Sequence, residues 1–455
     1  MGLLAAHIND AGISVLDADK VLYRESGVAL LDDDNLTTGA EAVAQARLKP
    51  RRIQNSYWSD LRTAPLADRH FEHLSAADLA SRQLEHIWKR VAGPQDRAII
   101  AVPAYMGKEN LSLLLGITAE LKVPVIAMVD AAVAATRREY QGAVPVHVDL
   151  SLHSTLLTRI SQSGQAQVDR SSVVSESGVL ALYEAWIALI AEAFVQQSRF
   201  DPLHTAETEQ MLQDKLPDWL ATASAQENVA LQIEYRGIKH DAELESLEFV
   251  AAAAPIYHSI VSNVRALYRA EESPALQLSE RAARMPGLAD ILSARVGGET
   301  YLQEPGATAR GLLSRCRDMQ ADTGAVSLIR QLPWDQAAVE STSTDVVHTK
   351  GQPTHLLFDN HAFSIDMQAL TLGSKAGGGE RYVELRQDMP GVSRRHCSVS
   401  RENGQCIVRD YSRYGTFLNG HRIDGSAVLQ IGDLIRLGTP GFEMRLITTA
   451  SDDGS

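Results

Sequence analysis

The sequence changes character once, between residues 331 and 353, and this change constrains the fold more than any other feature. Before it, short apolar runs alternate with segments of helical periodicity, whereas after it short β-rich runs alternate with Gly, Asp, Asn and Pro. The stretch itself is polar and has no period. We therefore predict two independently folding parts, residues 1–330 and 354–449, joined by a linker over 331–353 and followed by a disordered tail over 450–455.

The first part has the alternation of strands and helices that is typical of an α/β layer. Its clearest helix begins at Ser75, which can cap the helix, with Asp78 placed favourably near the positive helix end. The expected strands cover 3–8, 13–16, 20–24, 98–102, 123–129, 144–160 and 275–279, with a turn at 163–165 and an extended pair over 230–240. The expected helices cover 75–91, 109–121, 131–140, 178–198, 243–269 and 285–292. This order predicts a mixed α/β fold.

Composition narrows the classes of partner. The net charge of −14 disfavours broad nucleic-acid binding. The charge is uneven: residues 371–449 hold 11 Lys/Arg and 8 Asp/Glu, a balance of +3, and the rest holds 32 and 49, a balance of −17. The longest apolar run, 180–195, is interrupted by Glu184 and Glu192 and is expected to be a core helix rather than a membrane span. The N-terminus lacks the basic region of a signal peptide, and the three cysteines lack metal spacing. We expect a cytoplasmic protein with a protein partner and no metal.

The C-terminal part carries the most specific pattern in the chain. Its motifs, in order, are Leu-Thr-Leu-Gly at 370–373, Gly-Val-Ser-Arg-Arg-His at 391–396, Asp-Tyr-Ser-Arg-Tyr-Gly-Thr-Phe-Leu-Asn-Gly at 410–420 and Leu-Gln-Ile-Gly-Asp at 429–433. Over about 352–449 this resembles forkhead-associated (FHA) domains. The resemblance implies an all-β sandwich that binds phosphothreonine through loops at one end.

The same resemblance assigns roles to individual residues. It places Ser393 and Arg394 in the phosphate-binding loop, with His396 bracing that loop and Asn419 and Gly420 shaping a neighbouring turn.

Two positions depart from the family pattern. Ser374 stands where the family usually has a phosphate-contacting Arg, and Arg413-Tyr414 stand where it often has a Ser/Thr-Asn pair. Lys375 and Arg413 could supply replacement charge. Phosphothreonine-dependent docking and phosphate-independent docking both remain open.

The N-terminal part resembles the ATPase domain of DnaK-type chaperones, members of the actin-like ATPase superfamily. The resemblance rests on Val-Pro-Ala-Tyr at 102–105, on a strand-then-alanine-rich helix over 123–135 and on Val-His-Val-Asp-Leu at 146–150. A further segment, 276–286, resembles the adenosine-binding region. The ordered set implies a two-lobed actin-like fold across 1–330.

The glycines that cradle ATP phosphates in that family are missing. Three segments lack them: Ala-His-Ile-Asn-Asp-Ala-Gly at 6–12, Asp-Leu-Ser-Leu-His-Ser at 149–154 and Leu-Ser-Glu-Arg at 278–281. Asp149, Asp10 and Gly12 could retain a residual nucleotide site, although a leftover strand-end carboxylate is the favoured interpretation of Asp149. The sequence therefore predicts a pseudo-ATPase with no catalytic residues and no cofactor. We expect it to act in signalling as a scaffold or regulatory protein that docks a phosphorylated or acidic protein partner through its FHA domain. The alternative is an active, Mg·ATP-dependent ATPase with chaperone-like cycling.

Overall fold

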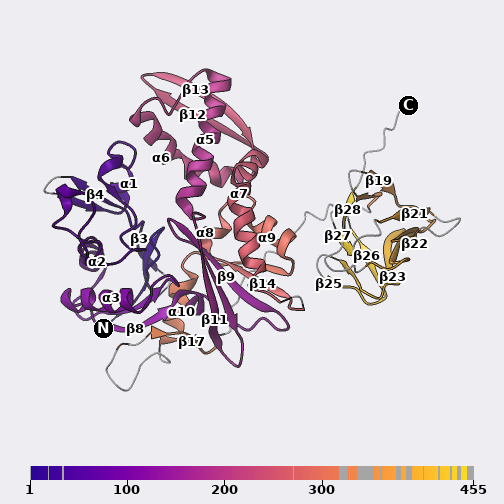
Figure 1. Cartoon of the computed structure of the whole chain (residues 1–455), viewed down its shortest axis with the longest axis horizontal. Coiled ribbons are helices and arrows are strands. Elements are labelled where there is room, and N and C mark those ends of the chain that lie inside the picture. Colours follow the sequence, from indigo (N-terminus) through magenta and orange to yellow (C-terminus); the bar gives the residue numbers. More distant parts are fainter. Residues whose placement is uncertain are drawn as a thin grey trace. The chain divides into compact units, whose positions relative to one another are not determined.

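The chain forms two compact units, residues 1–341 and 342–455. The computed structural model describes residues 2–18, 20–32, 35–269, 271–316, 326, 328–335, 353–358, 361–375, 381–385, 392–402, 404–418, 421–430, 433–437 and 442–447. Figure 1 shows the first unit as a mixed helix-and-strand body and the second as strands. The mixed α/β class expected for the N-terminal part is confirmed.

The first unit contains two six-stranded sheets in which five strands follow the same order, while the sixth strand, β16 or β17, joins opposite edges. The N-terminal sheet runs β16-β8-β7-β1-β2-β3, and the second sheet runs β15-β14-β9-β10-β11-β17. In the N-terminal sheet these strands are β1 Leu3–His7, β2 Ile13–Asp17, β3 Lys20–Glu25, β7 Arg97–Val102, β8 Val125–Asp130 and β16 Leu328–Ile329. In the second sheet they are β9 Val144–Leu150, β10 Ser154–Ser161, β11 Ala166–Ser175, β14 Pro274–Leu278, β15 Glu299–Leu302 and β17 Gln331–Leu332.

The pairing directions repeat as well as the order. In each sheet three antiparallel strands come first, β1-β2-β3 and β9-β10-β11. A fourth strand, β7 or β14, then pairs in parallel with the first strand of each set, and a fifth, β8 or β15, pairs in parallel with the fourth. The first unit is therefore an internal duplication of one sheet plan.

Helices cover both sheets and bury three cores. Helices α2 Ala76–Val91 and α3 Lys108–Glu120 share a core with the N-terminal sheet. The short helices α4 Ala131–Ala135 and α10 Ala307–Ser314 share a core with strands of both sheets. The largest core joins the second sheet to α5 Val179–Ser198, α6 Ala206–Ala223, α7 Ser246–Arg265, α9 Leu288–Val296 and the hairpin β12 Asn228–Tyr235 with β13 Ile238–Glu245.

The remaining elements are short. They are α1 Ala40–Val43 and α8 Glu280–Ala283, the 3₁₀ turns Pro50–Arg52 and Arg69–Phe71, and a small sheet of β4 Ala29–Asp32, β5 Asn35–Thr38 and β6 Ile53–Gln54. Figure 1 shows α1 and β4 facing α5 and α6 across the body.

The helix start expected at Ser75 is confirmed. The Ser75 hydroxyl accepts a hydrogen bond from the Asp78 amide at 3.3 Å, and the Asp78 carboxylate accepts one from the Ser75 amide at 2.8 Å. This reciprocal pair is a capping box, which satisfies two amides that the helix itself cannot.

Helix α5 is a core helix although it is long and apolar enough to cross a bilayer. It contacts α6, α7 and β13, and Trp186 on it is fully buried and donates to the Phe249 carbonyl at 2.8 Å. Its Glu184 and Glu192 face away from the core. The core-helix interpretation therefore fits its packing.

Three sequence-based expectations need correction. Helix α6 was not expected, because Pro217 and its mixed polar sequence obscure the periodicity. The helix expected over 131–140 ends at Ala135, where the buried Arg315 guanidinium bonds to carbonyls at its C-terminal end. The linker does not begin at 331, since β17 pairs with β11 in the second sheet.

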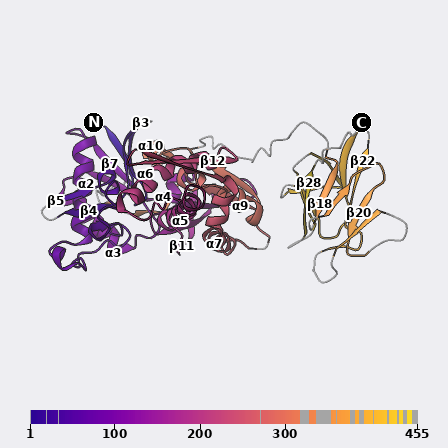
Figure 2. The same ribbon diagram turned by 90° about the horizontal axis from the view of Figure 1, so that it is seen from above.

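The second unit is a β-sandwich, as expected for its fold class (Figure 2). One sheet runs β19-β18-β28-β27-β24-β25 and the other runs β21-β20-β22-β23-β26. The first holds β18 His355–Phe358, β19 His361–Ser364, β24 Thr416–Leu418, β25 His421–Arg422, β27 Leu434–Leu437 and β28 Phe442–Ile447. The second holds β20 Leu370–Gly373, β21 Arg381–Glu384, β22 Cys397–Glu402, β23 Gln405–Asp410 and β26 Ser426–Leu429. One apolar core contains side chains from both sheets.

Candidate functional site

The first unit holds a cavity of about 700 Å³, which we call the cleft. Its walls come from the β1–β2 turn and β3 on the N-terminal side, and from α5, α6, α8 and residues 303–308 on the other. The cleft thus lies between the two copies of the duplicated sheet plan. Asp149 and Gly12, two of the residues expected in a residual nucleotide site, line it.

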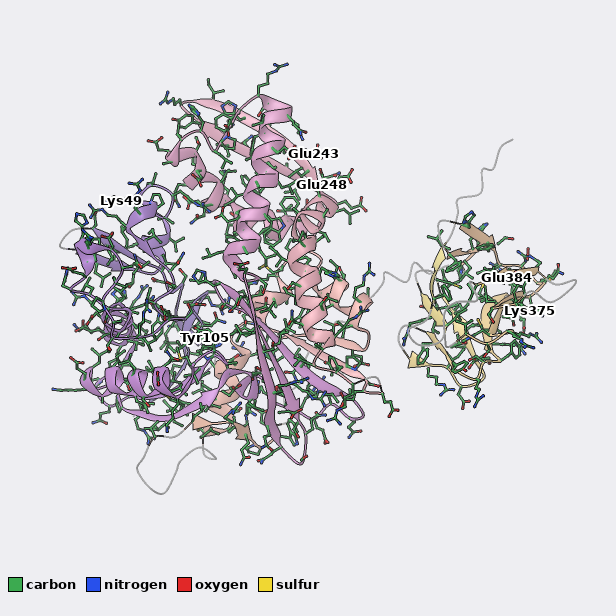
Figure 3. The ribbon with its side chains drawn as sticks, viewed as in Figure 1. Lys49, Tyr105, Glu243, Glu248, Lys375 and Glu384 are labelled. Carbon is green, nitrogen blue, oxygen red and sulfur yellow. The ribbon has the colours of Figure 1, made fainter. Side chains whose placement is uncertain are left out.

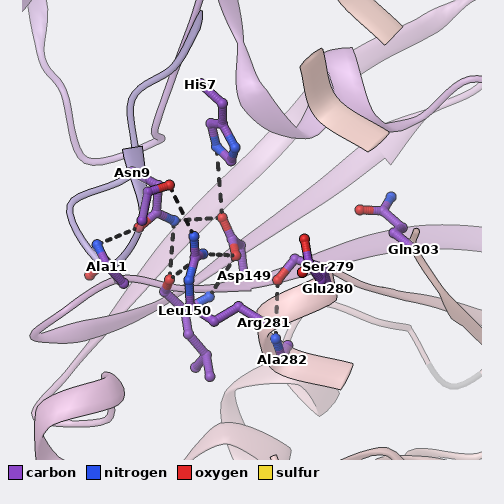
Figure 4. Close-up of polar contacts among 12 residues, drawn as sticks. His7, Asn9, Ala11, Asp149, Leu150, Ser279, Glu280, Arg281, Ala282 and Gln303 are labelled. Atoms are coloured by element: carbon purple, nitrogen blue, oxygen red, sulfur yellow. Dashed lines mark hydrogen bonds and ion pairs between the residues drawn. The ribbon is translucent and has the colours of Figure 1, made fainter. Parts of the chain in front are cut away.

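Asp149 at the end of β9 is buried and fully engaged by neighbouring side chains (Figure 4). It accepts hydrogen bonds from Asn9 Nδ2 at 2.7 Å and from Arg281 Nη1 at 2.9 Å. Arg281 also donates to the carbonyls of Leu150 at 2.9 Å and Gly12 at 3.4 Å. Burial acts to raise the pKa of Asp149, but the charge of Arg281, together with His7, His147 and a hydrogen bond from Ser279, holds that pKa below its usual value. Asp149 is therefore an ionised partner of an internal guanidinium.

Asp10 in the β1–β2 turn joins the two sheet copies. Its Oδ1 accepts a hydrogen bond from the Leu152 amide at 2.8 Å, and burial raises its pKa to about 6. The Leu152 side chain packs with Val28, Leu30 and Ala42. In the turn 151–153, the Leu152 amide is therefore bonded to an aspartate and the Leu152 side chain is packed in an apolar cluster.

The N-terminus of α5 is occupied as well. The amides of Val179 and Leu180 donate to the carbonyls of Ser151 and Leu152 at 2.9 and 3.0 Å. Amides at a helix N-terminus are a common anion site, but these two already have protein acceptors.

Ion pairs tie the two walls of the cleft together. Arg24 on β3 makes a two-pronged contact with Glu280 on α8, at 2.7 and 3.0 Å. Arg47, which follows α1 in the chain, forms ion pairs with Glu184 on α5 and with Glu209 on α6, the second at 2.9 Å. Together with Arg281 and Asp10, these contacts link elements on the two sides of the cleft.

A buried histidine lies beside Asp149. His7 Nε2 is 4.0 Å from the Asp149 carboxylate, and burial lowers the His7 pKa to about 4, so the ring is neutral at pH 7. Tyr105, labelled in Figure 3 inside the first unit, has its pKa raised well above its usual value by burial and by the nearby charges of Asp10 and Asp149. Among the described residues, no three His, Cys, Asp or Glu side chains gather so as to hold a metal ion.

The second unit brings its predicted site residues together at one end of the sandwich. Ser374 N donates to the Ser393 carbonyl at 3.1 Å, so the segment after β20 runs beside the segment before β22. Gly373 allows this approach, because a Cβ there would lie 2.0 Å from the Arg394 carbonyl oxygen. Arg413 N donates to Ser393 Oγ at 3.1 Å, which brings in the loop between β23 and β24. Three loops therefore converge on Ser393.

His396 braces this end from inside, as the resemblance implied. It is fully buried, its Nδ1 accepts from the Ser393 amide at 3.1 Å, and its Nε2 donates to the Gly415 carbonyl at 3.0 Å. Burial lowers the His396 pKa, which favours the neutral ring that this pattern of one acceptor and one donor requires. Asn419 and Gly420, the other two expected bracing residues, lie outside the described residues.

The charged side chains of the loops around Ser393 are exposed. Lys375, Arg394 and Arg413 are exposed, and none forms an ion pair with the part of the chain that the structure describes. Figure 3 labels Lys375 at the periphery of the second unit. Ser393 Oγ accepts from an amide, so its own proton can be donated outward. Ser374 is half-buried beside this group, and the Tyr414 side chain is 51% exposed.

The comparison with known protein families identifies a domain in the second unit and gives no match for the first. Residues 371–438 match the family model of the FHA domain, which confirms the resemblance seen in the motifs. No curated protein matches the chain. FHA domains serve phosphopeptide-mediated protein–protein interaction, so the match indicates this class of interaction for the C-terminal unit.

Sequence reasoning missed two groups at these sites. Arg281 was seen only as a replacement for an expected glycine, and Tyr382, which contacts both Lys375 and Arg394, was not considered. The one available signal for Arg281 was a large cationic residue in a segment where the resembled family has glycine.

Proposed function

We propose that the chain is a non-catalytic docking protein whose FHA domain binds a partner phosphorylated on threonine. The observation that carries this proposal is that the loops bearing three exposed cations, Lys375, Arg394 and Arg413, meet at Ser393, and that none of the three pairs with a described carboxylate. A phosphate is best bound by donors from several loops together with a guanidinium. The FHA match and the +3 balance of the module, against −17 elsewhere, support the same partner chemistry.

The departures from the family pattern are compatible with this role. Ser374 cannot supply the missing guanidinium, but Lys375 follows it directly and is exposed. Arg413 replaces an expected Ser or Thr, and its backbone amide donates to Ser393 Oγ while its side chain is exposed. The positive charge that is absent at Ser374 is thus supplied by Lys375, the next residue, and by Arg413 on the loop between β23 and β24. Tyr414 offers an exposed aromatic ring in place of the expected asparagine amide.

For the first unit we propose a degenerate actin-like fold that serves as a scaffold. The duplicated sheet plan with a cleft between its copies supports this proposal. A cavity of about 700 Å³ is large enough for a nucleotide, which is the observation favouring the alternative of an active ATPase.

The residues of the cleft do not fit Mg·ATP. The Leu152 amide already donates to Asp10, the Leu152 side chain packs in an apolar cluster, and the Asp149 carboxylate is paired with Arg281. Phosphate oxygens would have to displace a carboxylate, and Mg²⁺ would have to displace a guanidinium. We therefore propose that the first unit turns over no nucleotide.

The docking proposal is tested with two fluorescent peptide pools that share random flanks. One pool has a central phosphothreonine and the other a central threonine, and fluorescence anisotropy with the full chain measures both affinities. We expect the phosphorylated pool to bind at least about tenfold more tightly, the equivalent of about 1.4 kcal/mol. Equal affinity for the two pools would contradict phosphothreonine recognition and favour phosphate-independent docking.

A further inference from the structure

Tyr382 lies on β21 and reaches the two loops that carry the free cations. In the sheet, β21 runs parallel to β20, with Tyr382 beside Thr371. From this position its hydroxyl accepts a hydrogen bond from the Lys375 amide at 3.2 Å and donates one to the Arg394 carbonyl. One phenol oxygen therefore links the backbone of Lys375 to the backbone of Arg394.

This link falls where the backbones are otherwise weakly joined. The direct contact between the Lys375 amide and the Arg394 carbonyl is long, 3.4 Å, whereas the preceding pair, from Ser374 N to Ser393 O, measures 3.1 Å. A Cβ on Gly373 would lie 2.6 Å from the Tyr382 hydroxyl and 2.0 Å from the Arg394 carbonyl. The missing side chain at Gly373 therefore leaves room for the phenol to complete the junction.

We propose that Tyr382 is a positioning residue for phosphate recognition, which fixes Lys375 against Arg394 so that Lys375 can replace the absent guanidinium at position 374. This rests on the proposed function of the domain. A lysine has a flexible side chain and costs conformational entropy when it is fixed, so anchoring its backbone lowers the cost of presenting the charge. Tyr382 does not itself touch the phosphate in this account.

The test compares Tyr382→Phe with Tyr411→Phe in the full chain. Tyr411 is the control because its hydroxyl contacts Ser398 Oγ on β22, at 3.3 Å, whereas the Tyr382 hydroxyl bonds to Lys375 and Arg394. Loss of a single hydrogen-bonding hydroxyl typically changes an equilibrium by about three- to tenfold. We expect Tyr382→Phe to weaken binding of the phosphothreonine pool by that factor, and Tyr411→Phe to change it less than about twofold. Both variants keep the aromatic ring, and melting curves of each verify that the domain remains folded.

Two further readouts separate positioning from a general structural effect. Binding through an exposed cation weakens with salt, so Tyr382→Phe should flatten the dependence of affinity on ionic strength as Lys375→Ala does. In the Lys375→Ala background, Tyr382→Phe should lower the affinity for the phosphothreonine pool little further, because both substitutions remove the contribution of Lys375 to binding. Additive losses, or wild-type affinity in Tyr382→Phe, would overturn the inference while leaving the docking proposal intact. Equal binding of the phosphothreonine and threonine pools by the wild type would overturn both this inference and the docking proposal.

Discussion

The Arg281 guanidinium lies 2.9 Å from the Asp149 carboxylate and joins α8 to the end of β9 at the cleft. The same side chain reaches the Gly12 carbonyl in the β1–β2 turn. It therefore connects both copies of the duplicated sheet plan through one charge. This part of the cleft is therefore occupied by the chain's own cation.

Removal of Arg281 should destabilise the first unit. Arg281→Ala leaves the buried Asp149 without its ionic partner, and breaking a buried pair in this way typically costs about 3–5 kcal/mol. The double variant Arg281→Ala/Asp149→Ala should recover part of that loss, because no buried charge remains. Chemical denaturation of the three variants and the wild type measures the coupling. A double variant that is destabilised by the sum of the single losses would contradict the pairing.

The purified chain should bind and hydrolyse Mg·ATP no better than a blank. The amide of Leu152 and the carboxylate of Asp149 already have protein partners, so neither is available to phosphate or Mg²⁺. Calorimetric titration with Mg·ATP and a phosphate-release assay check this expectation. Turnover above the blank that disappears in Asp149→Ala would show a working site and favour the ATPase alternative.

Asp10→Asn should stabilise the chain at neutral pH. The folded state raises the Asp10 pKa from 3.8 to about 6, so the ionised carboxylate destabilises the fold above pH 6 and the effect vanishes below pH 3.8. The asparagine can still accept from the Leu152 amide, and its NH₂ replaces a buried oxygen that has no partner among the described residues. We expect a gain of up to about 3 kcal/mol at pH 7.5 that disappears near pH 3.5.

Asp96→Asn serves as the opposite control for this experiment. Asp96 accepts hydrogen bonds from the amides of Gly93 and Gly2 at 2.9 and 2.7 Å, which lower its pKa. Its ionised form therefore stabilises the fold, and the substitution should lower stability at pH 7.5. If both substitutions shift stability in the same direction, the electrostatic account of Asp10 is wrong.

The sequence predicted motifs that act locally and missed contacts that depend on the tertiary fold. The FHA domain was identifiable because its loop residues occur in a fixed order, and the α2 cap was identifiable because Ser75 and Asp78 are three residues apart. Arg281 and Asp149 are 132 residues apart, and their pairing depends on how α8 packs beside β9. Helix α4 ends early because of Arg315, which approaches from a distant segment. No local pattern encodes such contacts.

His396→Ala should lower both stability and partner binding. The substitution removes a buried ring and its two hydrogen bonds, to Ser393 and Gly415, a loss of about 2–4 kcal/mol. Since burial lowers the folded-state pKa of His396 below 6.5, the wild type should lose part of this stabilisation as the pH falls below 6.5. The difference in unfolding free energy between wild type and variant should therefore shrink from pH 7.5 to pH 5. A difference that does not vary with pH would contradict a neutral bracing ring.

Charge reversal at Arg394 tests the central claim, phosphate-dependent docking through this end of the FHA domain, most directly. Arg394 is exposed, so Arg394→Glu should leave the melting temperature unchanged. Arg409→Glu is the matched control, because Arg409 is an exposed arginine of the same domain on β23, where it pairs with Glu402. Anisotropy with the phosphothreonine pool measures both variants against the wild type. The account predicts a loss of at least about tenfold for Arg394→Glu and a change below about threefold for Arg409→Glu. Wild-type affinity in a folded Arg394→Glu would contradict it.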